Sequence, residues 1–104
     1  MSGENLIPCY AAMYSRLRYV AQRHGYCLAV HGTMTRDFDL IAVPWVEDAS
    51  PEDVLVKALI EESHGFTAPH DVNPTKKPHG RLAYSIMLGG GPYLDLSITP
   101  RIKV

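Results

Sequence analysis

Two aspartates interrupt an apolar segment in the stretch HGTMTRDFDLIAVPW, residues 31–45. Side chains of a β-strand alternate between its two faces, so Asp37 and Asp39 share one face while the apolar residues that alternate with them share the other. A carboxylate is costly to bury unless it is paired or bound to a cation. The pair is therefore expected at a sheet edge or strand end, or in contact with a positively charged ligand.

The remaining patterns predict elements in the order α-β-β-α-β-β. Apolar residues recur at helical spacing from about Pro8 to His24. The run Ser50-Pro51-Glu52-Asp53 offers a capping serine, a first-turn proline and acids at the positive end of a helix dipole, which predicts a second helix ending by Gly65. Apolar segments bounded by turn residues predict four strands, over residues 26–31, 38–44, 81–88 and 93–98.

These elements predict one α+β domain over residues 1–104, with a small mixed β-sheet and both helices packed on one face. The strand over 38–44 is expected at the centre, between 26–31 and 93–98, because its apolar side needs covering. Residues 66–80 contain three prolines and are expected to form a long loop. Long loops in compact domains are often functional.

A third aspartate repeats the pattern of the first two. Asp95 interrupts the apolar strand over 93–98, where Leu94, Leu96 and Ile98 take the opposite face. If that strand lies beside the one over 38–44, the three carboxylates come within about 8 Å of one another, close enough to hold one or two Mg²⁺ or Mn²⁺ ions through oxygen ligands. Such ions can activate an attacking oxygen and stabilise a leaving pyrophosphate.

Together these residues resemble the signature of the nucleotidyltransferase superfamily that includes DNA polymerase beta. That family has a Gly-Ser or Gly-Gly turn after its first strand, here Gly32-Thr33, and a D-x-D or D-x-E on the second, here Asp37-Phe38-Asp39. Its third carboxylate lies on a later strand, like Asp95. The small size and leading helix are most similar to the minimal nucleotidyltransferases, some of which act as antitoxins. The chain as a whole also resembles small uncharacterised bacteriophage proteins.

The resemblance implies Mg²⁺-dependent transfer of a nucleotidyl group from a nucleoside triphosphate to a hydroxyl on protein, RNA or a small molecule. Gly32 and Thr33 would approach the nucleotide phosphates, and Asp37 and Asp39 would bind metal. Asp95 would complete the metal site or act as a base toward the acceptor hydroxyl.

Two arginines are further candidates for nucleotide binding. Arg36 lies beside the turn, and Arg81 ends the most basic stretch of the chain, residues 76–81, which is expected to reach phosphate or RNA beside the carboxylates. In the alternative reading that stretch is a solvated loop, Arg36 and Asp37 form a surface ion pair, and Asp95 is an exposed edge residue.

The connection between the turn and the D-x-D departs from the family pattern. Only Met34, Thr35 and Arg36 separate Thr33 from Asp37, whereas the family has a longer connection with a short helix whose N-terminus binds phosphate. This spacing favours an alternative function, a non-catalytic binding module of phage accessory or antitoxin-like type. A structural homodimer, formed through a sheet edge or the first helix, is a third interpretation.

Composition excludes some partners. A formal net charge of −1 argues against a protein that binds duplex nucleic acid through a strongly basic face. No apolar run approaches the roughly 20 residues that span a bilayer, and the N-terminus lacks the features of a signal peptide. Cys9 and Cys27 lack CxxC spacing, so a cytoplasmic protein with reduced thiols and no membrane partner is expected.

Overall fold

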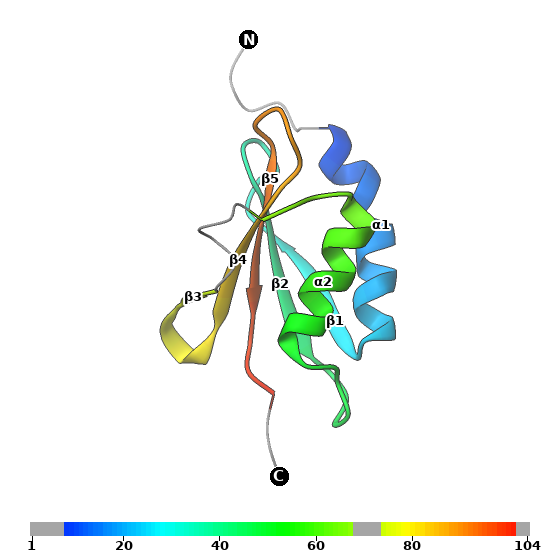
Figure 1. Cartoon of the computed structure of the whole chain (residues 1–104), viewed down its shortest axis with the longest axis vertical. Helices are drawn as coiled ribbons and strands as arrows, with labels where there is room; N and C mark the ends of the chain where they lie inside the picture. Colours follow the sequence, from blue (N-terminus) through cyan, green and yellow to red (C-terminus); the bar gives the residue numbers. More distant parts are fainter. Residues whose placement is uncertain (1–7, 68–73, 102–104) are drawn as a thin grey trace.

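The computed structural model describes residues 8–67 and 74–101. Within them two helices pack side by side on one face of a five-stranded mixed sheet (Figure 1). The elements in chain order are α1 (Pro8–Arg23), β1 (Tyr26–His31), β2 (Phe38–Pro44), α2 (Glu52–Ser63), β3 (Thr75–Lys76), the 3₁₀ turn η2 (Pro78–Gly80), β4 (Leu82–Met87) and β5 (Tyr93–Ile98). The α+β class expected from the sequence is confirmed.

Strand β2 occupies the position expected for it, between β1 and β5. The strands lie in the order β1-β2-β5-β4-β3, and β2 runs antiparallel to β1 but parallel to β5. The hairpin of β4 and β5 and the short β3 complete the sheet with antiparallel pairs. Because β2 and β5 are parallel, both strands begin at the same end of the sheet.

The order α-β-β-α-β-β expected from the sequence is wrong at one point, because it lacks the strand β3. Residues 66–80 were expected to form a loop, but part of this segment pairs with the sheet. Thr75 and Lys76 form the edge strand β3 on β4, and Phe66 makes two backbone hydrogen bonds with Met87, of 2.9 and 2.7 Å. Residues 68–73 of this predicted loop lie outside the described residues. A strand of two residues is too short to show the alternation by which strands are recognised in a sequence.

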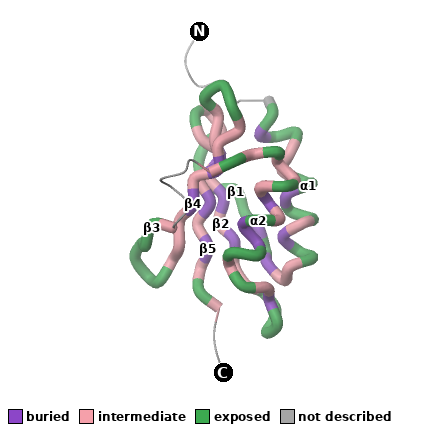
Figure 2. The backbone as a smooth tube through the Cα atoms, in the orientation of Figure 1, coloured by how far each residue is buried: buried purple, intermediate pink, exposed green. Residues whose placement is uncertain are grey.

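Alternation along β2 and β5 separates a buried face from an open face. Their buried residues meet both helices in one core (Figure 2), and the largest fully buried side chains are Tyr10, Tyr26, Phe38, Leu17, Leu28, Leu40, Leu55, Leu59, Ile86, Leu94, Leu96 and Ile98. The residues between them, including Asp39, Ile41, Asp95 and Ser97, are only partly buried. No helix among residues 8–67 and 74–101 covers this side, which we call the open face.

The start of α2 differs from the sequence-based expectation. Ser50 was expected to cap the helix, but Pro51 is the N-cap residue and no side chain caps the first turn. The Ser50 hydroxyl instead lies 2.9 Å from His24 Nδ1, at the end of α1. The serine therefore links the two helices rather than capping the second.

Candidate metal centre

The structure brings the three predicted carboxylates together on the open face. The parallel register pairs Asp39 of β2 with Asp95 of β5, and Asp37 directly precedes β2. One carboxylate oxygen from each residue can be chosen so that all three lie within 4.8 Å of one another. The expected convergence within about 8 Å is confirmed. Hard divalent cations take this type of oxygen ligand, at about 2.0 to 2.6 Å from the ion.

The three carboxylates, which we call the acidic triad, repel one another. Burial, followed by hydrogen bonding with Asp37 and by the negative charges of Asp37 and Asp95, raises the pKa of Asp39 from its ordinary 3.8 to about 6. No ion pair in the described part of the chain offsets this charge, since the ion pairs there join Arg16 to Glu62 and Arg101 to Glu52. A divalent cation would remove the repulsion and favour the ionised form of all three groups.

The predicted glycine turn also meets the triad. Gly32 has φ of +87°, in the left-handed region, and a Cβ at that position would lie 2.7 Å from Asp39 Oδ2. The backbone conformation favours glycine, and a side chain at this position would displace the Asp39 carboxylate. Thr33 is exposed, and its hydroxyl lies 2.8 Å from that of Thr35. Arg36 is exposed in the same connection, which contains no helix.

A groove of about 480 Å³ extends from the triad along the open face. Its lining includes Asp39, Asp95 and His31 together with Ser97, Lys77 and Arg81. Arg81 Nη1 lies 3.5 Å from Ser97 Oγ, and its Nε donates to the Pro78 carbonyl oxygen at 3.2 Å. Ser97 follows Asp95 on the same face by two residues, roughly 7 Å along the strand. The groove thus brings cationic groups close to the acidic triad.

Sequence reasoning named Arg81 but not Lys77 or Ser97 individually. The position of Ser97 two residues after Asp95 was a usable signal, since both residues share a strand face. Tyr93 has the same relation to Asp95 on its other side. Burial and then the charges of Asp37 and Asp95 raise the pKa of Tyr93, so its phenol lies in the field of the triad.

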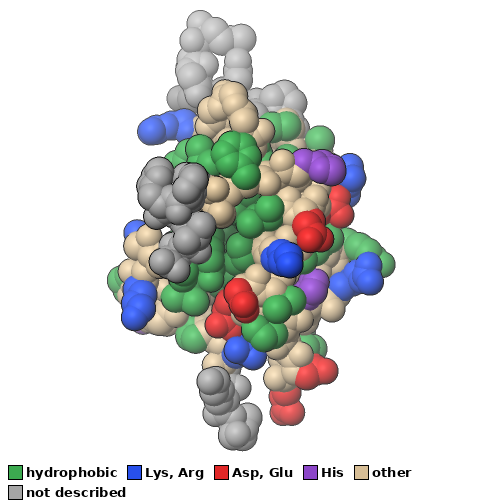
Figure 3. Space-filling model, viewed as in Figure 1, with side chains coloured by type: hydrophobic (Ala, Val, Ile, Leu, Met, Phe, Trp, Pro, Cys, Tyr) green, Lys and Arg blue, Asp and Glu red, His purple; other side chains and the backbone are tan. Residues whose placement is uncertain are grey.

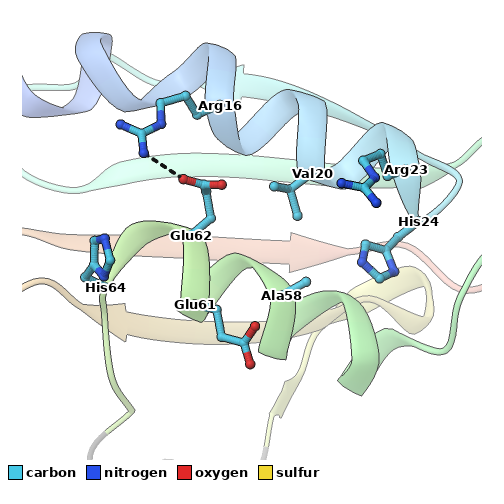
Figure 4. Close-up of a pocket in the computed structure, with 8 residues that line it drawn as sticks. All are labelled: Arg16, Val20, Arg23, His24, Ala58, Glu61, Glu62 and His64. Carbon is cyan, nitrogen blue, oxygen red and sulfur yellow. Dashed lines mark ion pairs between the residues drawn. The ribbon is translucent and has the colours of Figure 1, made fainter.

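A second groove, of about 540 Å³, lies between α1 and α2 on the helical side of the sheet (Figure 4). An ion pair of 3.1 Å between Arg16 and Glu62 crosses it. Its charges are of both signs, and its histidines and glutamates form no potential metal-binding group among the described residues. Basic and acidic side chains are likewise interspersed on the molecular face in Figure 3. The acidic triad is therefore the better candidate for a functional site.

Comparison of the chain with protein-family models, curated proteins and solved structures gives no match. In the described residues, no helix is both long and apolar enough to cross a membrane. Function therefore has to be inferred from the chemistry of the open face.

Proposed function

We propose that this protein is a minimal nucleotidyltransferase-like enzyme that transfers a nucleotidyl group from a nucleoside triphosphate to a hydroxyl on protein, RNA or a small molecule. Asp37, Asp39 and Asp95 would hold Mg²⁺ or Mn²⁺. The observation that carries the proposal is the convergence of these carboxylates, from two parallel neighbouring strands, to within 4.8 Å. The cation would supply positive charge for the phosphates and for the leaving pyrophosphate.

The order of the surrounding groups supports this choice of reaction. Gly32 follows the first strand and lies against Asp39, the D-x-D spans the start of the second strand, and Asp95 lies on the strand beside it. Nucleotidyl transfer needs a carboxylate site next to groups that bind phosphate. In this proposal Asp95 would complete the metal site or act as a base toward the attacking hydroxyl.

The basic part of the groove supports a phosphate-bearing substrate. Lys77 and Arg81 line the same groove as Asp39 and Asp95, with the Ser97 hydroxyl between the two sets of charges. In this proposal Lys77 and Arg81 bind the terminal phosphates while the triad binds the reacting end. They would replace the helix N-terminus that the short connection between β1 and β2 does not provide.

That short connection is also the observation that favours a second candidate function. Residues 32–37 hold no helix, and Thr33 and Arg36 are exposed. A non-catalytic binding module of accessory or antitoxin-like type would use the groove to bind a partner and transfer nothing. The two functions differ in whether a nucleotide becomes covalently attached to an acceptor.

A thermal-shift series tests the proposal first. The shift induced by Mg²⁺ or Mn²⁺ with each nucleoside triphosphate is measured for the natural protein and for Asp37→Asn, Asp39→Asn and Asp95→Asn. We expect a ligand-induced shift that Asp37→Asn and Asp39→Asn abolish, because a ligand bound only to the folded state stabilises it. Asp48→Asn, on an exposed residue of the connection between β2 and α2, is the matched control and should keep the shift.

The second stage separates catalysis from binding. Labelled nucleoside triphosphates are incubated with the protein and an extract of its native host, and transfer of label is followed. Asp95→Asn should reduce transfer more than binding, and Arg81→Ala should weaken triphosphate binding but not metal binding. Lys57→Ala, which removes an exposed cation from α2, is the control for Arg81→Ala. Metal-independent melting with every triphosphate and no transfer would leave the binding module as the function.

A further inference from the structure

Tyr10 connects helix α1 to the backbone on which the acidic triad is built. Its side chain is fully buried, and its hydroxyl donates to the Arg36 carbonyl oxygen at 2.8 Å, with the Tyr93 carbonyl oxygen at 3.3 Å as a second acceptor. The same hydroxyl accepts the Tyr93 N–H at 3.0 Å. One phenolic oxygen thus contacts the chain two residues before β2 and at the first residue of β5.

These contacts are made where the spacing of the triad is set. The Arg36 carbonyl belongs to the peptide bond that leads into Asp37, and Tyr93 lies two residues before Asp95. The Tyr10 ring is held by stacking on Phe38, with ring centroids 5.0 Å apart and planes inclined by 23°. Burial raises the pKa of Tyr10, so the hydroxyl keeps its proton and its donor role. The stacked ring and the hydrogen bonds of its hydroxyl therefore tie the two strand starts together, in addition to the ladder that pairs β2 with β5.

We propose that Tyr10 is a positioning residue that holds the starts of β2 and β5 at the spacing at which Asp37 and Asp95 share one cation. The inference rests on the proposed metal site, and it adds that the geometry of the site is controlled from the helical side of the sheet. Tyr10 itself touches none of the reacting groups. Groups that orient metal ligands in this way change metal affinity when they are removed, even though they do not bind the metal.

Tyr14 provides a matched control within the same helix. It also packs on Phe38, with ring centroids 6.2 Å apart in an edge-on arrangement, and its hydroxyl donates to the Leu28 carbonyl oxygen at 2.7 Å. That carbonyl belongs to β1, which carries none of the three carboxylates. Tyr14→Phe therefore removes a hydroxyl and a backbone hydrogen bond of the same type, but it keeps the ring on Phe38 and removes no hydrogen bond to the strand starts that Tyr10 links.

The experiment compares Tyr10→Phe with Tyr14→Phe in the full chain. Each change removes one oxygen and keeps the ring, and denaturant unfolding measures the stability of both variants. Mn²⁺ affinity is measured by electron paramagnetic resonance of the free ion. We expect Tyr10→Phe to weaken Mn²⁺ binding by about tenfold or more and Tyr14→Phe to leave it unchanged. Amide exchange at Tyr93 should be faster only in Tyr10→Phe, because its N–H loses its acceptor.

Equal Mn²⁺ affinity in the natural protein and Tyr10→Phe would overturn the positioning role while the proposed function stands. If the natural protein binds no Mn²⁺, the proposed function and the shared cation fail together. The carboxyl ¹³C shifts of the triad then decide the remaining part of the inference, that Tyr10 sets the spacing of Asp37 and Asp95. A change of those shifts in Tyr10→Phe alone supports it. Similar shifts in Tyr10→Phe, Tyr14→Phe and the natural protein overturn it.

Discussion

Replacing Asp39 by asparagine should stabilise the protein when no divalent cation is present. The pKa of Asp39 is about 6 in the folded chain, against an ordinary 3.8, so the folded state binds this proton more tightly than the unfolded state. A raised carboxyl pKa contributes stability that is fully present below about pH 4 and is lost as the pH rises to about 6. At pH 7 the ionised group therefore destabilises the fold, and a neutral amide that can donate to Asp37 or Asp95 relieves the repulsion.

The size of the effect follows from the pKa of Asp39. A rise from 3.8 to about 6 corresponds to about 3 kcal/mol at 1.36 kcal/mol per pKa unit. The side chain is only partly buried, so screening by solvent lowers this value, and we expect about 1 to 1.5 kcal/mol of added unfolding free energy. For a domain of this size, about 1 kcal/mol raises the melting temperature by roughly 4 to 8 °C.

The assay is urea unfolding of the natural protein, Asp39→Asn and the control Asp48→Asn, each with a chelator at pH 4 and pH 7. The difference between Asp39→Asn and the natural protein should be small at pH 4 and about 1 to 1.5 kcal/mol at pH 7. Saturating Mg²⁺ at pH 7 should reverse the ranking, because only the natural protein retains the full set of carboxylates. If Asp39→Asn is no more stable than the natural protein at pH 7 with chelator present, the electrostatic reasoning is refuted.

Two further changes test other parts of the structure. Gly32→Ala should lower the unfolding free energy by at least about 1 kcal/mol, from its positive φ alone, and should also weaken Mn²⁺ binding by displacing the Asp39 carboxylate. Gly90 also has a positive φ, but a Cβ there would meet nothing within 4 Å, so Gly90→Ala should lower the unfolding free energy without weakening Mn²⁺ binding. Equal Mn²⁺ affinities in Gly32→Ala and Gly90→Ala would contradict the predicted contact with Asp39. Leu96→Ala, in the buried core of β5, should cost about 2 to 5 kcal/mol in urea unfolding. A cost below 1 kcal/mol, of the kind seen at exposed sites, would show that the helices do not close over this strand.

The sequence was sufficient for the parts of the site that depend on alternation. Asp39 and Asp95 each stand between buried residues, and that pattern alone predicted which face of β2 and β5 is open. The adjacency of the two strands was also expected, because the apolar side of β2 needs covering at the centre of the sheet. Strand β3 could not be predicted, since Thr75 and Lys76 become a strand only by pairing with residues of β4.

The long-range hydrogen-bond partners of side chains could not be predicted from the sequence either. Tyr10 lies in the segment where helical spacing of apolar residues predicted the first helix, but its hydrogen bonds reach residues 26 and 83 positions away. Ser50 had the residue type of a helix cap, yet tertiary contact with His24 took precedence over that local role. Local patterns identify which residues are buried, whereas the partner of a buried polar group depends on how the elements pack.

The pairing of β2 with β5 also determines when the site can exist during folding. Phe38 pairs with Leu94, 56 positions later in the chain, and the same separation holds along the whole strand pair. Contacts that close such long loops form slowly, because chain entropy is lost before they contribute stability. The β1–β2 hairpin can form early, but Asp39 meets Asp95 only once the final strand has docked. Cation binding should therefore report complete folding, and a chain that ends before β5 would lose the central strand pair and the site together.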